Sequence, residues 1–354
     1  MKSERDLASL VARLEAMLGA QPAPIAPTSE HKTMGGLINA YLQAVAVSKS
    51  DKLLLNTLYG RIGKVETPVL GYEWIEEWIQ EMKVVGNLNP STIRHYVGAV
   101  GRCLDWACRK RILSTSQNPV RQLPKSYAQY TERDAQVALA QNPEFTVQED
   151  DERDRRLEHG EEDRIRWILD RNKPEGRQRP MLLTYQAALE LLFDLALETA
   201  MRMREIYTLS LDQVDFDRRT IFLDRTKNGD KRQVPMSSVA VERINKYLAH
   251  VAAGERGMEN YAFPGGRLLP WWDGKASSLT RTTAMLSRQF GRIFDAAGCP
   301  DLRFHDLRHE ATSRFFERTS MQDFEVMKIT GHSSTRMLRR YSNIRGSTLA
   351  DKLW

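Results

Sequence analysis

The chain has 354 residues, of which 41% are hydrophobic, so it is long enough for two domains with buried cores and is not a disordered tail. Its 52 Lys and Arg residues outnumber its 46 Asp and Glu residues, and the net charge of +6 favours polyanionic partners without singling out nucleic acid. The N-terminus lacks an apolar signal segment, and the most apolar run is interrupted by Glu190, Asp194 and Glu198. We therefore expect a cytoplasmic protein with no membrane partner.

The cysteines argue against a disulfide framework and against a zinc site. Cys103, Cys108 and Cys299 are odd in number and lack C-x-x-C spacing, which is typical of reduced structural thiols. The sequence predicts no metal and no other cofactor.

Residues 1–32 are predicted to form a short helix on a proline-rich tether. Leu7, Leu10 and Leu14 recur at helical spacing, and the stretch QPAPIAPTSE that follows contains three prolines, which cannot continue a helix.

Residues 33–123 carry several helical patterns and are predicted to form a helical domain. In the clearest pattern, Pro90 and Ser91 give a start signal, and apolar residues then recur every three or four positions. Asp105 is the only acid between Arg94 and Lys125, so the opposite face of this helix is basic. The basic residues expected to contact a polyanion are Arg94, Arg102, Arg109, Lys110 and Arg111.

Residues 124–152 lose helical periodicity and end in an acidic run, which predicts an interdomain linker. A second domain, 153–354, is predicted to open with helices at about 160–171 and 181–199. The stretches TIFLD and RQVPM then flank Asn228 and Gly229, a strong hairpin signal. The fold class predicted for the whole chain is therefore mainly α with one small antiparallel β-sheet.

Four short stretches of the second domain hold residues that could carry chemistry. Each residue alone has an ordinary explanation: Arg202 as a surface arginine, Lys227 as a solvated turn lysine, and Tyr341 as half-buried structure. The HDLRH stretch also has the histidine spacing of a zinc motif, but Asp306 is too short to replace the glutamate base of that motif. The candidate set is Arg202, Lys227, His305, Arg308, His332 and Tyr341.

Taken together, two arginines, a lysine, two histidines and a tyrosine can attack a phosphodiester without a metal. The pentavalent transition state carries extra negative charge, which forked guanidinium donors bind well. A free phenol has a pKa of about 10, so a tyrosine nucleophile needs help to lose its proton. The leaving 5′ oxygen needs a proton, which a lysine on a hairpin can donate.

The order and spacing of these motifs closely resemble those of the tyrosine recombinases, the phage integrase family. The motifs are TAMRMREI, TKNG, HDLRH and a GH pair followed by a tyrosine nine residues later. The resemblance covers roughly residues 153–344, and more weakly residues 33–123, which are similar to the core-binding domain of the family. It implies a helical core-binding domain and a mixed α/β catalytic domain.

The resemblance also assigns a role to each residue. Arg202 and Arg308 would bind the scissile phosphate, Lys227 would be the general acid, and His305 and His332 would assist, with Tyr341 as the nucleophile.

Three neighbouring positions stay outside this catalytic list. Glu205 is expected to support the site and His309 to pack beside it. Ala200 stands where the family commonly has glycine.

The function implied is site-specific DNA recombination by a homotetramer on double-stranded recombination sites, through a 3′-phosphotyrosyl link and a Holliday junction. Accessory DNA-bending or directionality factors are possible partners. The alternatives are a type IB topoisomerase and a DNA-binding protein without catalysis. Residues 1–32 are too few for an arm-binding domain, and Leu349, Leu353 and Trp354 in the tail are expected to dock onto a neighbouring protomer or back onto their own domain.

Overall fold

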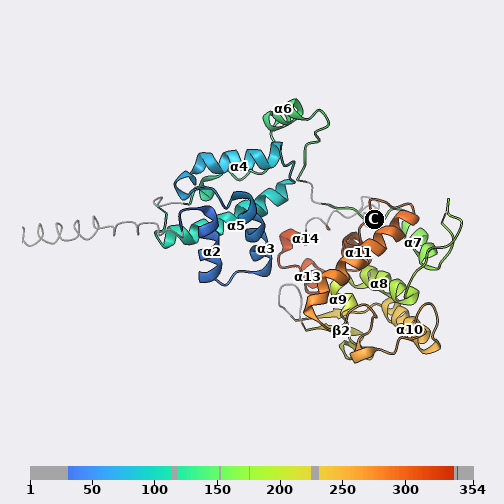
Figure 1. Cartoon of the computed structure of the whole chain (residues 1–354). Helices are drawn as coiled ribbons and strands as arrows, with labels where there is room; N and C mark the ends of the chain where they lie inside the picture. Colours follow the sequence, from blue (N-terminus) through green and yellow to red (C-terminus); the bar gives the residue numbers. More distant parts are fainter. Residues whose placement is uncertain are drawn as a thin grey trace, which may run out of the picture. The chain divides into compact units, whose positions relative to one another are not determined.

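The computed structural model describes residues 31–113, 118–150, 153–174, 176–224, 231–338 and 341. The chain divides into two compact units, Met1–Glu152 and Arg153–Trp354 (Figure 1). The helix predicted within residues 1–32 and the tail after Tyr341 lie outside the described residues. The prediction of a mainly α chain with one small antiparallel sheet is confirmed. In the described part of the chain, no helix is long and apolar enough to cross a membrane.

The described elements of the first unit are helical. They are α2 (Met34–Ala44), α3 (Lys49–Ile62), η2 (Thr67–Val69), α4 (Tyr72–Val84), α5 (Pro90–Arg109), η3 (Pro119–Gln122) and α6 (Glu132–Gln141).

Helix α5 is the central helix of this unit and begins where the sequence predicts. The Asn89 side chain accepts a hydrogen bond of 2.9 Å from the Ser91 amide, and Pro90 occupies the first helical position, where no amide donor is needed. The predicted apolar stripe is fully buried against α2 and α3. Its members are Ile93, Val97, Val100, Leu104 and Ala107.

The range expected to be a linker is partly helical. Helix α6 lies within 124–152 and packs on α4, where Lys83 forms a buried ion pair of 3.0 Å with Asp134. Asp134 also completes a capping box with Thr131 at the start of α6. The sequence did not predict this helix, because a buried ion pair and a capping box stabilise it and neither produces a periodic pattern of apolar residues.

The second unit is built around helix α8. Its helices are α7 (Glu161–Leu169), α8 (Gln186–Thr199), α9 (Met203–Tyr207), α10 (Ser238–Ala253), α11 (Leu279–Ala296), α12 (Phe304–Arg318), α13 (Asp323–Thr330) and α14 (Thr335–Leu338). Its short 3-10 helices are η4 (Leu211–Gln213), η5 (Pro264–Gly266) and η6 (Ala276–Ser278).

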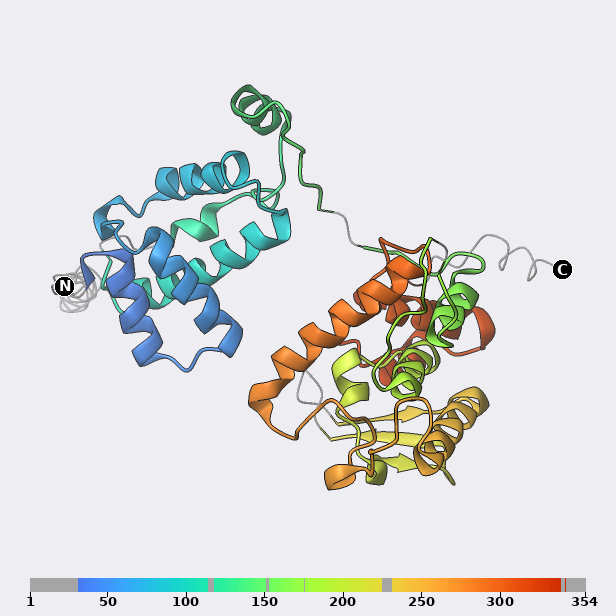
Figure 2. The same ribbon diagram turned by 45° about the vertical axis from the view of Figure 1, so that its right-hand side comes forward.

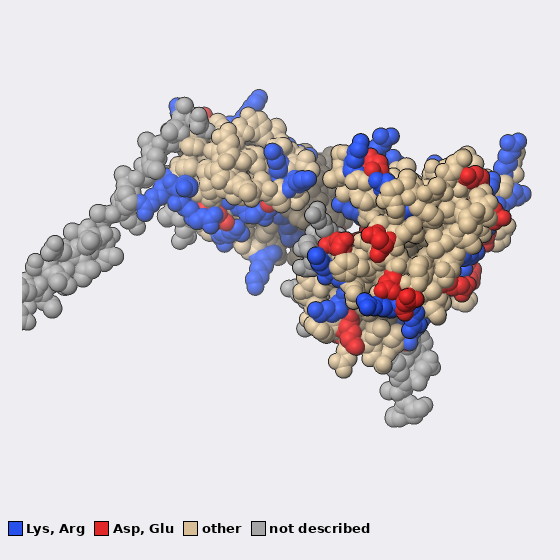
Figure 3. All heavy atoms as spheres, turned by 90° about the horizontal axis from the view of Figure 1, so that it is seen from below, with Lys and Arg blue, Asp and Glu red and all other residues tan. Residues whose placement is uncertain are grey.

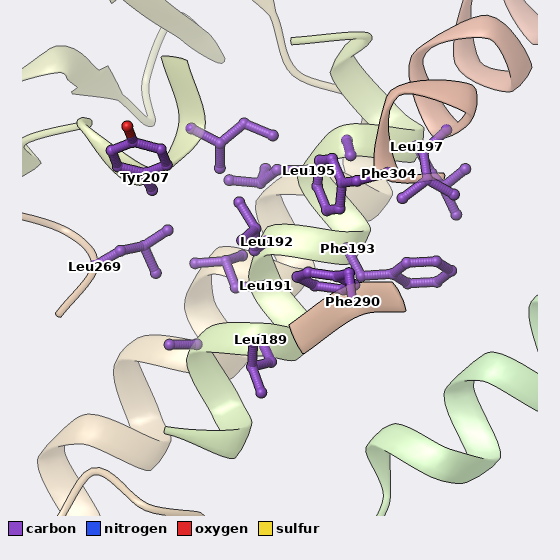
Figure 4. Packing of buried hydrophobic residues seen from close by; sticks show 14 of the residues in the cluster. Leu189, Leu191, Leu192, Phe193, Leu195, Leu197, Tyr207, Leu269, Phe290 and Phe304 are labelled. Carbon is purple, nitrogen blue, oxygen red and sulfur yellow. The ribbon is translucent and has the colours of Figure 1, made fainter. Parts of the chain in front are cut away.

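Nearly every residue of α8 is buried, because α7, α9, α10 and α12 all pack on it. Figure 4 shows Leu192 and Phe193 of α8 beside Phe290 of α11 and Phe304 of α12. The rings of Phe290 and Phe304 meet edge to face with centroids 4.7 Å apart, an arrangement that contributes about 0.5–1.5 kcal/mol beyond burial.

Helix α8 begins at Gln186, later than the predicted 181. Tyr185 adopts a left-handed backbone (φ 56°), so the helix cannot extend further toward the N-terminus. Met181 and Leu183 are buried although they are not helical. An apolar run alone does not distinguish a buried helix from a buried segment of irregular chain.

The small sheet lies at the edge of the second unit, beside α10 (Figure 2). Strands β1 (Val214–Asp215), β2 (Thr220–Leu223) and β3 (Arg232–Pro235) are antiparallel in the order β1-β2-β3. Leu223 pairs with Arg232 at the end of the ladder. The predicted turn at Asn228 and Gly229 lies outside the described residues, as does Lys227.

Removing Asp134 should destabilise the first unit. Burial raises the pKa of this carboxyl, but hydrogen bonds from the Thr131 amide and from Lys83 outweigh burial and leave the pKa below its ordinary value. Asp134→Ala leaves Lys83 buried and unpaired, so the free energy of unfolding at neutral pH should fall by about 3–5 kcal/mol in urea denaturation.

The difference between the parent and this variant should shrink in acid. A carboxyl whose pKa is lowered on folding stabilises the fold at pH values above its pKa in the unfolded chain. This stabilisation is lost as the pH falls through its pKa in the folded chain. Glu132→Ala, at an exposed position of the same helix, is the control and should change stability little. Equal losses in the two variants would contradict the role given to the ion pair.

Candidate active site

Arg202 lies at the start of α9, held by the carboxylate of Glu205. Glu205 accepts 2.9 Å hydrogen bonds from the backbone amide and from Nη1 of Arg202. The same carboxylate accepts two hydrogen bonds, of 3.0 and 2.7 Å, from Arg232 on β3. Burial alone would raise the pKa of Glu205, but the bonds from Arg232 and Arg202 outweigh it and lower the pKa. One buried carboxylate thus orients two guanidinium groups.

Arg308 of α12 is almost fully buried and is held by neutral groups. It donates to the carbonyl of Ala200, and its Nη2 donates over 2.7 Å to the carbonyl of Thr330. These carbonyls stand at the C-terminal ends of α8 and α13, where helix carbonyls lack internal partners and carry partial negative charge. Arg308 therefore ties together the ends of two helices.

No carboxylate pairs directly with Arg308 in the part of the chain that the structure describes, and the charge of Glu205 acts on it only from a distance. Burial, and then the nearby charge of Arg202, lower its pKa to about 10. At neutral pH the group is still a cation. A buried cation of this kind is stabilised by a bound anion, which restores the interactions lost on burial.

His332 follows α13 and contacts Arg308. Its Nε2 lies 3.3 Å from Nη2 of Arg308, and its Nδ1 lies 2.7 Å from Oγ1 of Thr330. The Thr330 hydroxyl donates to the carbonyl of Val326, so its oxygen accepts from Nδ1, and Nε2 faces the arginine as an acceptor. This network assigns a neutral imidazole to His332.

Gly331 is the position that allows this turn. It ends α13 in the left-handed region (φ 71°), which favours glycine. A β-carbon there would also lie 2.8 Å from Nη1 of Arg232. The backbone conformation therefore favours glycine before His332, and a larger residue would also displace the Arg232 side chain.

Tyr341 lies in the same cluster. Its side chain is buried beside Phe316, Val326 and Leu338, and its ring centroid is 5.4 Å from that of His332. Its hydroxyl is near enough to Arg308 to influence the pKa of the guanidinium.

His309 also contacts this tyrosine, with ring centroids 5.2 Å apart, and His309 meets His305 edge to face at the same separation. His305 is exposed in the first turn of α12, whereas His309 is buried. Ring contacts thus connect His305, through His309, to Tyr341.

Five of the six candidate residues are described, and Lys227 lies outside the described residues. Sequence reasoning did not identify Arg232, although it shares Glu205 with Arg202 and also donates to the carbonyl of Ile329 over 3.0 Å. Its only signal was its place in the predicted strand RQVPM. Among the described residues no three His, Cys, Asp or Glu side chains are gathered as metal ligands.

The basic face of α5 is partly neutralised within its own unit. Asp150 accepts two hydrogen bonds of 2.6 Å from Arg94, and Asp51 pairs with Arg102 at 2.7 Å. Asp51 and Asp150 both lie outside the stretch from Arg94 to Lys125, in which Asp105 is the only acid. Arg109, Lys110 and Arg111 are exposed at the end of α5. On the face drawn in Figure 3, Lys and Arg predominate on the first unit, and the second unit carries both signs.

Comparison with known proteins gives the family. The model of the phage integrase family matches residues 162–347, more than half of the chain. A shufflon-specific DNA recombinase of Escherichia coli is 35% identical over 202 residues, which make up 57% of this chain and 43% of that protein. This chain belongs to the phage integrase family, the tyrosine recombinases.

Other relatives and solved structures agree with this family. A tyrosine recombinase XerC of Mycobacterium sp. (strain KMS) is 23% identical over 286 residues, 80% of each chain. The Tn1549 transposon integrase in complex with circular intermediate DNA has the same fold, with a TM-score of 0.60, 19% identity, and 91% of this chain and 99% of that chain covered.

XerH recombinase bound to its palindromic difH substrate also gives a TM-score of 0.60, at 14% identity, with 94% of this chain and 98% of that chain covered. The chain spans less than half the length of the shufflon-specific recombinase and of a putative integrase/recombinase of Haemophilus influenzae, 43% and 40%.

Ala200 offers a test of strain at this site. Its left-handed backbone (φ 52°) costs a residue with a β-carbon about 1–2 kcal/mol. Glycine would remove this cost, but it also gives the unfolded chain more conformational freedom, which cancels part of the gain in stability. Ala200→Gly should therefore raise the free energy of unfolding, by up to about 1 kcal/mol in urea denaturation. Ala249→Gly, at an exposed position inside α10, should lower it by about 1 kcal/mol. A loss of stability in both variants would exclude strain at Ala200.

Proposed function

We propose that this chain is a site-specific DNA recombinase that cuts and rejoins DNA strands through a covalent 3′-phosphotyrosyl link. The observation that carries the proposal is the buried Arg308 cation, held by neutral groups and grouped with Arg202, Arg232 and the Tyr341 phenol. Such a cluster favours a phosphodiester, because a phosphate oxygen supplies the negative charge that would balance the Arg308 cation. Family membership supports the same conclusion.

In the proposed reaction the phenol of Tyr341 gives its proton to an imidazole of the site as its oxygen attacks phosphorus, and the bond from phosphorus to the 5′ oxygen breaks. Arg202 and Arg308 bind the non-bridging oxygens as charge develops on them. His305 and His332 assist, and Lys227 donates the proton that the leaving oxygen takes up. The free 5′ hydroxyl of a partner duplex then attacks the phosphotyrosine, and the enzyme is released.

The covalent link conserves the energy of the phosphodiester, so the proposed reaction needs neither ATP nor a metal. By family resemblance, four protomers act in pairs on double-stranded sites and pass through a Holliday junction, with accessory DNA-bending or directionality factors as further partners. Arg94, Arg102, Arg109, Lys110 and Arg111 are proposed backbone contacts of the first unit. Arg94 and Arg102 would exchange their surface carboxylate partners for DNA phosphates at little cost in free energy. A cytoplasmic location belongs to the same proposal.

Replacing the nucleophile tests the proposed function. The recombination site is first selected from a random duplex library by its binding to the full chain. Tyr341→Phe should bind this site with unchanged affinity and form no covalent adduct on denaturing gels, because only the attacking oxygen is lost.

Each outcome of this experiment has a distinct meaning. An adduct formed by Tyr341→Phe would overturn the assignment of the nucleophile. A parent chain that binds its site but forms no adduct would be a DNA-binding protein without catalysis. Relaxation of supercoiled DNA without a preferred site would instead indicate a type IB topoisomerase.

Removing either proposed phosphate clamp should slow cleavage far more than it weakens binding, and the melting temperature of each variant is measured as well, because Arg308 also ties together the ends of two helices. Arg202→Ala and Arg308→Ala should each lower the rate of adduct formation by at least ~10²-fold, the scale for one preorganised transition-state donor. Arg318→Ala changes an exposed arginine in the last turn of α12 and is the matched control. Rates near that of the control would exclude the clamp.

A further inference from the structure

The segment that opens the second unit is bound to the back of α12. Arg153 donates from Nε to Asp306 over 2.8 Å and from Nη2 to the same carboxylate over 2.6 Å. Asp306 is 1% exposed and also caps α12 by accepting 2.7 Å from the Arg303 amide. A forked guanidinium therefore holds the first turn of α12, between His305 and Arg308.

Arg156 makes the same kind of contact further along the helix. Its Nε lies 3.0 Å from Glu310, and its Nη1 and Nη2 donate to Glu317 over 2.6 and 2.9 Å. The amide of Leu157 also donates to Glu310, over 3.3 Å. Glu310 is buried and also accepts a hydrogen bond of 2.7 Å from Nε of Arg314, whereas Arg153 is the guanidinium that compensates the buried charge of Asp306 among the described residues.

The three carboxylates form one stripe on α12. Since a helix turns by about 100° per residue, Asp306, Glu310 and Glu317 fall within about 40° of one another around the axis, and Arg308 points to the opposite side. The ion pairs thus hold the back of the helix whose front carries the proposed phosphate clamp. Rotation or sliding of α12 would break these pairs and displace Arg308 and His305 together.

We propose that Arg153 and Arg156 are positioning residues for the reaction, which fix the rotation and axial position of α12 so that Arg308 and His305 meet the scissile phosphate. This inference rests on the proposed function. It adds that the clamp is aligned by the first residues of the second unit, which touch neither the phosphate nor the proposed nucleophile.

The test compares Arg153→Gln and Arg156→Gln with the parent in the full chain. Affinity for the selected site is measured by mobility shift, and adduct formation is measured at saturating protein on a nicked duplex that traps the covalent complex. Affinity should stay within ~2-fold, whereas the rate should fall at least ~10-fold, because small misplacements of catalytic groups cost rate rather than binding.

Three further variants separate positioning from general destabilisation. Arg153→Lys keeps the charge but not the fork, so its rate should be intermediate. Asp154→Asn, an exposed neighbour in the same segment, should react as the parent does. Ile244→Val in the core of α10 should lower the melting temperature without slowing cleavage well below it.

A readout independent of activity is amide hydrogen exchange in the first turns of α12. Residues 304–310 should exchange faster in Arg153→Gln than in Ile244→Val, because only the first variant frees the capped end of the helix.

The inference is overturned if the two glutamine variants react at the parent rate, or if Ile244→Val slows cleavage equally. It is also overturned if α12 is equally protected in all variants. A parent chain that forms no adduct would overturn the proposed function itself, and the inference with it.

Discussion

A single buried cation organises the second unit. Arg308 fills a position that a hydrophobic side chain could fill more cheaply, and it is kept there by carbonyls from the ends of α8 and α13 and by the imidazole of His332. Each of these groups stands at the end of a helix. The lengths and end points of α8 and α13 are therefore part of the site, and the packing around α8 fixes where the cation lies.

The ends of these helices show how local backbone conformation serves the site. At Gly331 the left-handed conformation is free of strain, and it turns the chain so that His332 faces Arg308. At Ala200 the same conformation carries a β-carbon and is strained, yet the carbonyl of Ala200 reaches Arg308. Ala200 is fully buried, and strain of this kind persists where the surrounding structure holds the backbone in place.

The sequence predicts the class of fold and the α5 stripe, because apolar periods are local properties. Motif spacing is local too and nominates the six candidate residues, whose roles stay predictions. The sequence did not predict α6 or the start of α8, since an ion pair and one left-handed residue decide those boundaries. The sequence also did not predict ion pairs between residues that are far apart along the chain. Asp150 on Arg94 and Arg232 on Glu205 join residues whose sequence positions give no sign of contact.

The charges of the described site match the reaction that we propose for it. Arg202, Arg232 and Arg308 contribute three positive charges, and Glu205 contributes one negative charge, while the hydrogen bonds of His332 leave it neutral. Two positive charges remain. A phosphodiester carries one negative charge in its ground state, and negative charge on its oxygens grows as the nucleophile adds. The described residues therefore hold a surplus of positive charge over the substrate, and Lys227 would add to it in the proposed reaction. A site with this balance binds the pentavalent state more strongly than the substrate, which is the condition for catalysis.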